Sequence, residues 1–225
     1  MTPETGHPST LALSWSGGKD SALALWTLRR DHGLWPRVLI TTMTDAYARV
    51  SMHGVRRELV VRQAEAAGVA LVEVAIPVGC TNDIYEQQMA AAFASESLRG
   101  IEGVAFGDLF LADVRAYRET RMRAAGLRAL FPLWQRDTDR LAREFIAAGF
   151  EAILVCVDPA QLDPSFAGRA FDAKLLDDLP PTVDPCGENG EFHTFVHAGP
   201  ILAHEIPCQV GETVERGGFV FCDLA

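Results

Sequence analysis

The hexapeptide Ser16-Gly17-Gly18-Lys19-Asp20-Ser21 constrains the fold most, because it joins an apolar, strand-like run at 10–15 to a helix-like run at 22–26. Glycine has no Cβ, so the backbone can approach an anion closely here, and the unpaired N–H groups of a new helix point at the same place. Lys19 would oppose the helix dipole unless an anion were bound between them. The hexapeptide therefore predicts a phosphate-binding loop between a strand and a helix. A glycine turn with a solvated lysine is the simpler alternative.

Two familiar nucleotide-binding patterns do not fit this loop. The Walker A pattern requires glycine five positions before Gly18 and a hydroxyl residue after the lysine, but Leu13 and Asp20 stand there. The dinucleotide-binding pattern requires glycines at the positions of Lys19 and Ala22. The loop therefore predicts neither a kinase-type nucleotide site nor a dinucleotide site.

Beyond the hexapeptide, apolar β-branched segments alternate with helical stretches, which is typical of a parallel sheet wrapped by helices. The expected strands are residues 10–16, 37–43, 69–75, 104–107, 129–132 and 152–158. The expected helices are residues 19–31, 55–67, 82–97, 112–125 and 137–148. Each helix is followed by a glycine that can end it: Gly33, Gly68, Gly100, Gly126 and Gly149. The fold class is therefore α/β, with a Rossmann-like parallel sheet and helices on both faces.

The pattern changes after Pro159, where loops rich in Pro, Asp and Gly begin. In this part we expect a helix at 169–179 and short strands at 191–196, 209–214 and 218–222. The chain is therefore predicted to consist of a phosphate-binding domain at 1–158 and a small α+β portion at 159–225, which packs near the same site.

In a sheet of this kind, ligands bind beyond the carboxyl ends of the strands. That rule brings the hexapeptide together with residues 44–54, Gly107-Asp108 and Asp158-Pro159. His53 could contact a nucleotide base or ribose, or be a loop histidine without a partner. Asp108 could help to hold Mg²⁺ or order an acceptor, and it could equally cap a helix.

A second motif at 184–196 crowds two glutamates, an amide, a thiol and an imidazole around two glycines. Asn189-Gly190 is a good hairpin tip, which is the simple structural interpretation. Glu188 and Glu191, however, repel each other on a tight turn unless a cation, an amine or a proton donor relieves them. The motif therefore predicts a site for ammonium, an amine or magnesium, with the plain hairpin as the alternative.

The sequence SGGKDS resembles the pyrophosphate-binding loop of the PP-loop ATP pyrophosphatases, which share the adenine nucleotide alpha hydrolase type of fold. The resemblance implies that ATP is cut between its α and β phosphates, leaving AMP on an acceptor oxygen while the loop holds pyrophosphate. The residues agree with this chemistry. Ser16, Ser21 and backbone N–H groups can hold pyrophosphate oxygens, and Lys19 can neutralise the charge of the leaving group.

Taken together, SGGKDS and GENGEFHTF resemble the diphthine-ammonia ligase family, and intermediate landmarks such as Met52-His53-Gly54-Val55 and Pro132-Leu133-Trp134 extend the likeness. The resemblance implies an ATP- and Mg²⁺-dependent ligase that adenylates a carboxylate and transfers ammonia to it. The implied catalytic residues are Lys19, Asp108, Glu188 and Glu191. The implied nucleotide-binding residues are Ser16, Gly17, Gly18, Lys19, Asp20, Ser21 and His53. The implied acceptor-side residues are Cys186, Gly187, Glu188, Asn189, Glu191, Tyr117 and Arg121. No metal ligand is assigned, although Asp20 or Asp108 could accompany magnesium.

Two departures from the family pattern bear on the acceptor. Members that amidate diphthine typically read G-E-G-G-E-[YF]-E-T, whereas this chain has Asn189 for the middle glycine and His193 for the later glutamate. Lys19 and Lys174 are the only lysines, and abundant arginine and alanine indicate a GC-rich coding sequence and hence a bacterium. Because diphthine would be absent from a bacterium, a small carboxylate or another protein side chain is the expected acceptor.

Composition narrows the partners and the compartment. The net charge of -10 disfavours nucleic acid, which is bound largely through Lys and Arg. The 5 cysteines form no Cys-x-x-Cys pair, which disfavours a disulfide framework and a zinc site. Without a secretory signal at 1–9 or an apolar run near the ~20 residues of a membrane helix, the chain is expected to be soluble and cytoplasmic. A homodimer is left open.

Two other functions remain as alternatives. Cys186 could be the reactive thiolate of a sulfurtransferase acting on adenylated tRNA, or simply a small buried thiol. The chain could also be a non-catalytic sensor of adenine nucleotides. His193 and His197 are expected to be strand residues rather than metal ligands.

Overall fold

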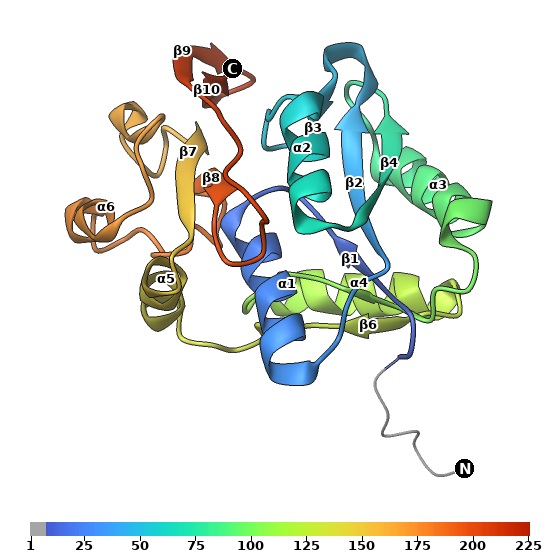
Figure 1. Cartoon of the computed structure of the whole chain (residues 1–225). Coiled ribbons are helices and arrows are strands. Elements are labelled where there is room, and N and C mark those ends of the chain that lie inside the picture. The colour runs from blue at the N-terminus through green and yellow to red at the C-terminus, as the bar shows by residue number, and fades with distance from the viewer. Residues whose placement is uncertain (1–7) are drawn as a thin grey trace.

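The structure, a computed structural model, describes residues 8–225 (Figure 1). The expectation about a secretory signal concerns residues 1–9 and so lies mostly outside the described part. The strands are β1 (Leu11–Ser14), β2 (Val38–Thr44), β3 (Arg49–Val50), β4 (Ala70–Ile76), β5 (Gly103–Ala105), β6 (Arg128–Leu130), β7 (Glu151–Val157), β8 (Phe192–Ala198), β9 (Val210–Arg216) and β10 (Phe219–Leu224). The α-helices are α1 (Lys19–His32), α2 (Arg57–Ala67), α3 (Asn82–Phe93), α4 (Ala112–Ala124), α5 (Thr138–Ala147) and α6 (Ala173–Asp178). Short 3-10 helices span Asp45–Tyr47, Glu96–Leu98 and Pro164–Phe166.

The first sheet is parallel in the order β4-β2-β1-β5-β6, and the short β3 pairs antiparallel with the carboxyl end of β2. This order reverses between β1 and β5, so the loops after those two strands leave in opposite directions. The α/β fold with a Rossmann-like parallel sheet is confirmed. The reversal places a ligand crevice next to the hexapeptide that follows β1.

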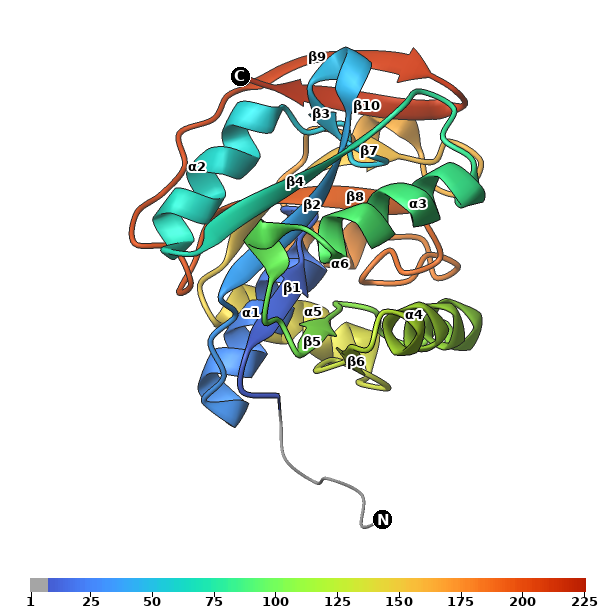
Figure 2. The same cartoon turned by 90° about the vertical axis from the view of Figure 1, so that its right-hand side faces the viewer.

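Alternate side chains of the central strands serve two apolar layers. Leu11, Leu13 and Leu39 are buried with the apolar residues of α1 and α2. Ala12 and Val104 are buried on the opposite face, against α3 and α4. Figure 2 shows the sheet between these two pairs of helices. The helices therefore cover both faces, as the run of apolar residues in the strands predicts.

The second sheet is antiparallel in the order β8-β7-β10-β9. The expectation that residues 152–158 form the last strand of the parallel sheet is therefore wrong. A buried strand has the same apolar pattern in either sheet, so composition could not decide its partner. Figure 2 shows β9 and β10 lying across the upper part of the molecule. The division of the chain at residue 158 stays a prediction, although β7 pairs with the strands that follow it.

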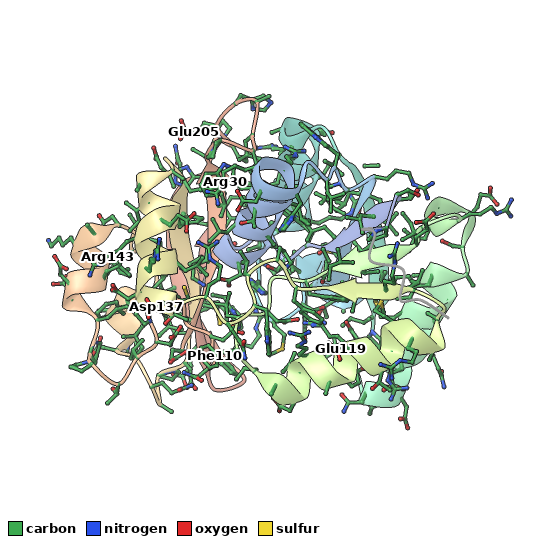
Figure 3. All side chains as sticks on the ribbon, turned by 90° about the horizontal axis from the view of Figure 1, so that it is seen from below. Arg30, Phe110, Glu119, Asp137, Arg143 and Glu205 are labelled. Atoms are coloured by element: carbon green, nitrogen blue, oxygen red, sulfur yellow. The ribbon has the colours of Figure 1, made fainter. Side chains whose placement is uncertain are left out.

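Both sheets share one core around α1. Leu154 of β7 and Phe195 of β8 belong to the same buried cluster as the apolar face of α1. Helix α5 packs on the other side of this core. Its Glu144 forms a 2.9 Å ion pair with Arg30 of α1, and Arg30 is labelled in Figure 3. The C-terminal strands are thus packed against the helix that begins at the predicted phosphate loop.

Local signals placed most element ends correctly. Gly33, Gly68, Gly126 and Gly149 stand at or directly after the caps of their helices, with positive φ between 63° and 83°. The expectation that a helix extends to residue 97 and is ended by Gly100 is wrong, because α3 ends at Phe93 and a separate 3-10 turn, Glu96–Leu98, precedes the glycine. Helix α6 is shorter than expected because Arg169 and Phe171 first form backbone hydrogen bonds with β7. The helix then begins at Asp172, whose carboxylate accepts a hydrogen bond from the N–H of Leu175 over 2.8 Å. Strand pairing, a tertiary effect, therefore removed the first turn of the expected helix.

Candidate functional site

The predicted phosphate loop lies where β1 ends and α1 begins. Gly17 has φ +79°, and a Cβ there would lie 2.7 Å from the side chain of Gln63. Gly18 precedes the helix with extended backbone, and its N–H donates to the Ser16 hydroxyl over 3.3 Å. The Ser21 hydroxyl donates to the carbonyl of Gly18 over 2.9 Å. The loop is therefore held by its own two serines, and its first glycine has no room for a side chain.

Lys19 is 4% exposed and points at its neighbour in the loop. Its Nζ donates to both Asp20 oxygens, over 2.8 and 2.9 Å. The rings of Phe171 and Phe192 lie 6.0 and 5.6 Å from the ammonium. Although burial favours the neutral amine, the negative charge of Asp20 raises the pKa of Lys19 above its ordinary value. The ammonium of Lys19 is therefore charged, shielded from solvent and held by the carboxylate of Asp20.

Strand β8 completes the loop from the other end of the chain. The N–H of Lys19 donates to the Thr194 hydroxyl over 3.0 Å, and the N–H of Val196 donates to the Gly17 carbonyl over 2.9 Å. A Cβ on Gly18 would lie 2.9 Å from the Thr194 carbonyl oxygen. The second glycine is therefore required by the close approach of β8.

The second motif forms a tight loop before β8, and Glu191 organises it. Glu191 is 1% exposed and accepts hydrogen bonds from the N–H of Asp184, the N–H of Asn189 and the Asn189 side chain, over 2.9 to 3.0 Å. Gly187 and Gly190 in this loop have positive φ. The Glu191 carboxylate is thus occupied by donors of its own loop, so its contacts are those of a structural residue.

Glu188 points out of the same loop toward the hexapeptide and the loop after β5. Its Oε1 accepts a hydrogen bond from the N–H of Leu109 over 2.8 Å. Burial raises the pKa of Glu188 to about 7, helped by the charges of Asp20 and Asp108 and opposed by Leu109 and Lys19. Figure 3 labels Phe110, the residue after Leu109, near the start of α4. Glu188 therefore exchanges a proton near neutral pH.

Asp108 lies close to this cluster but already has a partner. Arg118 of α4 donates to both of its carboxylate oxygens, over 2.5 and 3.1 Å. The preceding Gly107 packs so tightly on α1 that a Cβ would lie 2.9 Å from the backbone of Asp20. The predicted neighbours after β1 and β5 are thus brought together, whereas Asp158 lies beside the second motif, where its N–H donates to the Glu191 carbonyl over 2.9 Å.

A cavity of about 1270 Å³ opens at the carboxyl ends of β1, β2, β4 and β5. Helices α3 and α4 and the hairpin of β9 and β10 form its other walls. Of the predicted site residues, Ser16, His53, Tyr117 and Arg121 line it. The cluster around Lys19 and Glu188 adjoins the cavity at Ser16 and at Arg118, which pairs with Asp108. The predicted residues therefore fall into two adjacent groups, one in the cavity and one beside it.

Tyr117 and Arg121 form a small network on the cavity wall. Arg121 pairs with Glu86 of α3 over 2.5 Å and lies 5.3 Å from the Tyr117 ring centre. This network joins α3 to α4 across the cavity.

His53 stacks on His193 of β8, with ring centres 4.3 Å apart. Burial and the positive charge of Lys19 lower the pKa of His193 to about 4, and the pKa of His53 is also lowered well below its ordinary value. Both rings are therefore neutral. His193 and His197 lie on β8, as expected of strand residues. Residues 8–225 contain no group of three or more His, Cys, Asp or Glu side chains that could hold a metal ion.

Cys186 is buried, and its thiol donates to the carbonyl of Thr138 over 3.4 Å. Burial raises the pKa of this thiol far above its ordinary value. The thiol is therefore protonated at neutral pH, which does not suit a nucleophile.

Sequence reasoning missed Thr194 and Gln63, which both hold the hexapeptide. Gln63 is 0% exposed and donates to the carbonyls of Gly17 and Val196 over 2.9 and 2.6 Å. One signal was present in the sequence. Gln63 follows Leu59 by four residues on α2, so a polar side chain stands on the apolar face of the helix.

No helix in the described part of the chain is long and apolar enough to cross a membrane.

Comparisons with known proteins find family models that match both halves of the chain. The family model of the diphthamide synthase N-terminal domain matches residues 9–129, and that of the C-terminal domain matches residues 137–223. Diphthine-ammonia ligases of Rattus norvegicus and Homo sapiens are 31% and 30% identical over 65% of this chain. The chain spans 57% of the length of each of these relatives.

Two solved structures are also similar. A predicted subunit of tRNA methyltransferase from Methanocaldococcus jannaschii is 16% identical, with a TM-score of 0.42, over 88% of this chain and 100% of its own. A U34-tRNA thiolase from Methanococcus maripaludis is 17% identical, with a TM-score of 0.37, over 61% of this chain and 56% of its own. Because the N-terminal family model alone covers more than half of the sequence, the chain belongs to the diphthamide synthase family.

Proposed function

We propose that this protein is an ATP-dependent, AMP- and pyrophosphate-forming ligase that converts a carboxylate into an amide with ammonia. A carboxylate oxygen of the acceptor attacks the α phosphorus of ATP, and pyrophosphate leaves. Ammonia then attacks the acyl carbon, AMP leaves with the bonding electrons, and the nitrogen loses a proton. Family membership and the geometry of the loop after β1 support this proposal.

The observation that carries the proposal is the loop at the reversal of the sheet. A strand ends, two glycines follow that have no room for a side chain, and a helix begins beside a cavity of about 1270 Å³. Gly17 packs against the side chain of Gln63, and Gly18 packs against the backbone of Thr194. That volume exceeds the roughly 300–1,000 Å³ of common small-molecule sites, so ATP and part of an acceptor can fit together. Ser16 links the two, because it lines the cavity and accepts the hydrogen bond from Gly18.

Within this proposal the hexapeptide Ser16–Ser21 binds the β and γ phosphates. Backbone N–H groups and the hydroxyl of Ser16 supply donors, and Lys19 stabilises charge on departing pyrophosphate. The hydroxyl of Ser21 would join them by exchanging the carbonyl of Gly18 for a phosphate oxygen. His53 lies on the cavity wall, where it can contact the nucleoside.

Glu188 is proposed as the base for the amide-forming step. Ammonium must lose a proton before its nitrogen can attack, and a carboxyl whose pKa is about 7 accepts a proton readily at neutral pH. Glu191 is proposed to act through the loop it organises, so that it positions Glu188, Asn189 and Gly187.

Magnesium is proposed to arrive with ATP, bound mainly to the phosphate oxygens. Asp20 and Asp108 remain the nearest candidate ligands in the chain, and both are held by a cationic side chain, Lys19 and Arg118. A magnesium ion at either carboxylate would compete with that cation.

The acceptor is proposed to enter along α3 and α4, where Tyr117 and Arg121 line the cavity. Arg121 offers a guanidinium that suits a carboxylate once its pairing with Glu86 is exchanged. The names of the curated relatives support diphthine as one candidate. A small carboxylate or another protein side chain is the other, and it is favoured by Asn189 and His193 in the second motif.

The alternative functions have less support. A sulfurtransferase needs a thiolate, whereas burial keeps the thiol of Cys186 protonated. A nucleotide sensor would not need a buried lysine beside the position of a leaving group. The homodimer stays a prediction.

The test uses ATP labelled on the α phosphate, together with ammonium and candidate carboxylates. Stoichiometric AMP and pyrophosphate that depend on both ammonium and the acceptor support the ligase. Formation of ADP, or nucleotide binding without turnover for every acceptor, would reject it in favour of a phosphotransferase or a sensor.

A further inference from the structure

The side chain of Gln63 is buried in the middle of α2, yet all of its polar atoms have partners. Nε2 donates to the carbonyls of Gly17 and Val196 over 2.9 and 2.6 Å, and Oε1 accepts from the indole N–H of Trp15 over 3.1 Å. Two carbonyls on one side and one N–H on the other permit a single orientation of the amide. One side chain thus ties the end of β1, the phosphate loop and β8 together.

The hydrogen bond to Gly17 fixes the direction of one peptide group. The Gly17 carbonyl accepts from Val196 and from Gln63, both over 2.9 Å, so both of its lone pairs are used. Because a trans peptide is planar, the N–H of Gly18 points the opposite way. That N–H faces the hydroxyl of Ser16, which lines the cavity.

This peptide needs such a restraint, because it joins two glycines. Glycine populates positive and negative φ about equally, so the Gly17-Gly18 peptide can rotate to the reverse orientation at little cost. In the reverse orientation a carbonyl oxygen, and not an N–H, would face the Ser16 hydroxyl at the edge of the cavity. An oxygen there repels phosphate, whereas an N–H donates to it.

We propose that Gln63 is a positioning residue that prevents this peptide from flipping and so keeps the loop able to bind pyrophosphate. The proposal rests on the proposed function, since it assumes that the loop binds the β and γ phosphates. Gln63 touches no substrate. It acts through Gly17, and its contact with Val196 makes the orientation of the loop depend on β8.

The test measures binding of inorganic pyrophosphate and of AMP by titration calorimetry. Gln63→Met keeps the length of the side chain and removes its hydrogen bonds. We expect pyrophosphate binding to weaken about tenfold, as for one lost hydrogen bond, while AMP binding changes less than about twofold. Val60→Ala, a core truncation on the same helix, should lower the melting temperature without changing the ratio of the two affinities.

The outcomes separate the two proposals. If the native protein does not bind pyrophosphate, the proposed function fails. If the native protein binds it and Gln63→Met binds it equally well, or loses AMP and pyrophosphate alike, the role of Gln63 is overturned. Should Gln63→Met not fold, Trp15→Phe frees the amide from the other side. Trp15→Phe should weaken the binding of pyrophosphate relative to the binding of AMP by about threefold. An unchanged ratio of the two affinities would reject the proposal.

Discussion

The hydroxyl of Thr194 accepts a hydrogen bond from the backbone N–H of Lys19 over 3.0 Å, so a residue of β8 caps the helix that begins 175 positions earlier. Gly18, at the start of α1, offers no side chain for this purpose. The tertiary structure therefore supplies the cap through Thr194. The capped residue is Lys19, whose ammonium is proposed to stabilise the leaving pyrophosphate.

Removing this cap should destabilise the protein. Thr194→Val keeps the shape of the side chain but leaves the buried N–H of Lys19 without an acceptor, at a cost of about 1–3 kcal/mol in the free energy of unfolding. Urea unfolding monitored by circular dichroism measures the change. Thr194→Ser retains the hydroxyl and should lose clearly less stability, and equal losses for both variants would argue against the cap.

The ammonium of Lys19 should be needed for turnover. Lys19→Ala removes the charge next to the proposed pyrophosphate and is expected to slow AMP formation by ~100-fold or more, the scale of one lost electrostatic contact in a transition state. Lys174→Ala is a matched control, because Lys174 is the other lysine and is exposed. If both variants turn over like the native protein, Lys19 has no part in the reaction.

The carboxyl of Glu188 should make stability depend on pH. Its pKa is about 7 in the folded protein, above the ordinary value of 4.5, because burial disfavours the charge. The folded state therefore holds a proton that the unfolded state releases, and the resulting stability is present below about pH 4.5 and lost as pH rises through about 7. Relative to Glu188→Gln, the native protein should thus lose stability between these values. A constant difference in urea midpoint across that range would contradict the pKa.

The carboxylate of Glu191 should matter for the loop more than for chemistry. Glu191→Gln places an NH₂ group where two backbone N–H groups and an amide now donate. Loss of these charge-assisted hydrogen bonds should cost about 1.5–3 kcal/mol of stability, seen as a lower melting temperature. A variant with native stability but no turnover would instead make Glu191 a catalytic residue.

The thiol of Cys186 should be dispensable. Because burial keeps it protonated, Cys186→Ala is expected to retain AMP formation within about threefold of the native rate. Alkylation should also be slower at Cys186 than at Cys80, which is only partly buried. Complete loss of turnover in a folded Cys186→Ala variant would revive the sulfurtransferase alternative.

Local patterns predicted the residues that act through their immediate neighbours. The glycines that end helices, the strand-loop-helix unit at Ser16–Ser21 and the loop at 184–196 were all visible in the sequence, because each is specified within a few positions by backbone conformation. The pairing of β7 was not visible in the sequence, because a buried strand has the same apolar pattern in a parallel and in an antiparallel sheet.

The sequence by itself determined an α/β chain with a phosphate-type loop after its first strand, because period, glycine placement and polarity act over short distances. Only the tertiary structure decided that Gln63 and Thr194 hold that loop, and that Glu191 serves its own loop while Glu188 faces Leu109. Such hydrogen bonds join groups far apart in the chain, and their geometry exists only after the two sheets pack around α1.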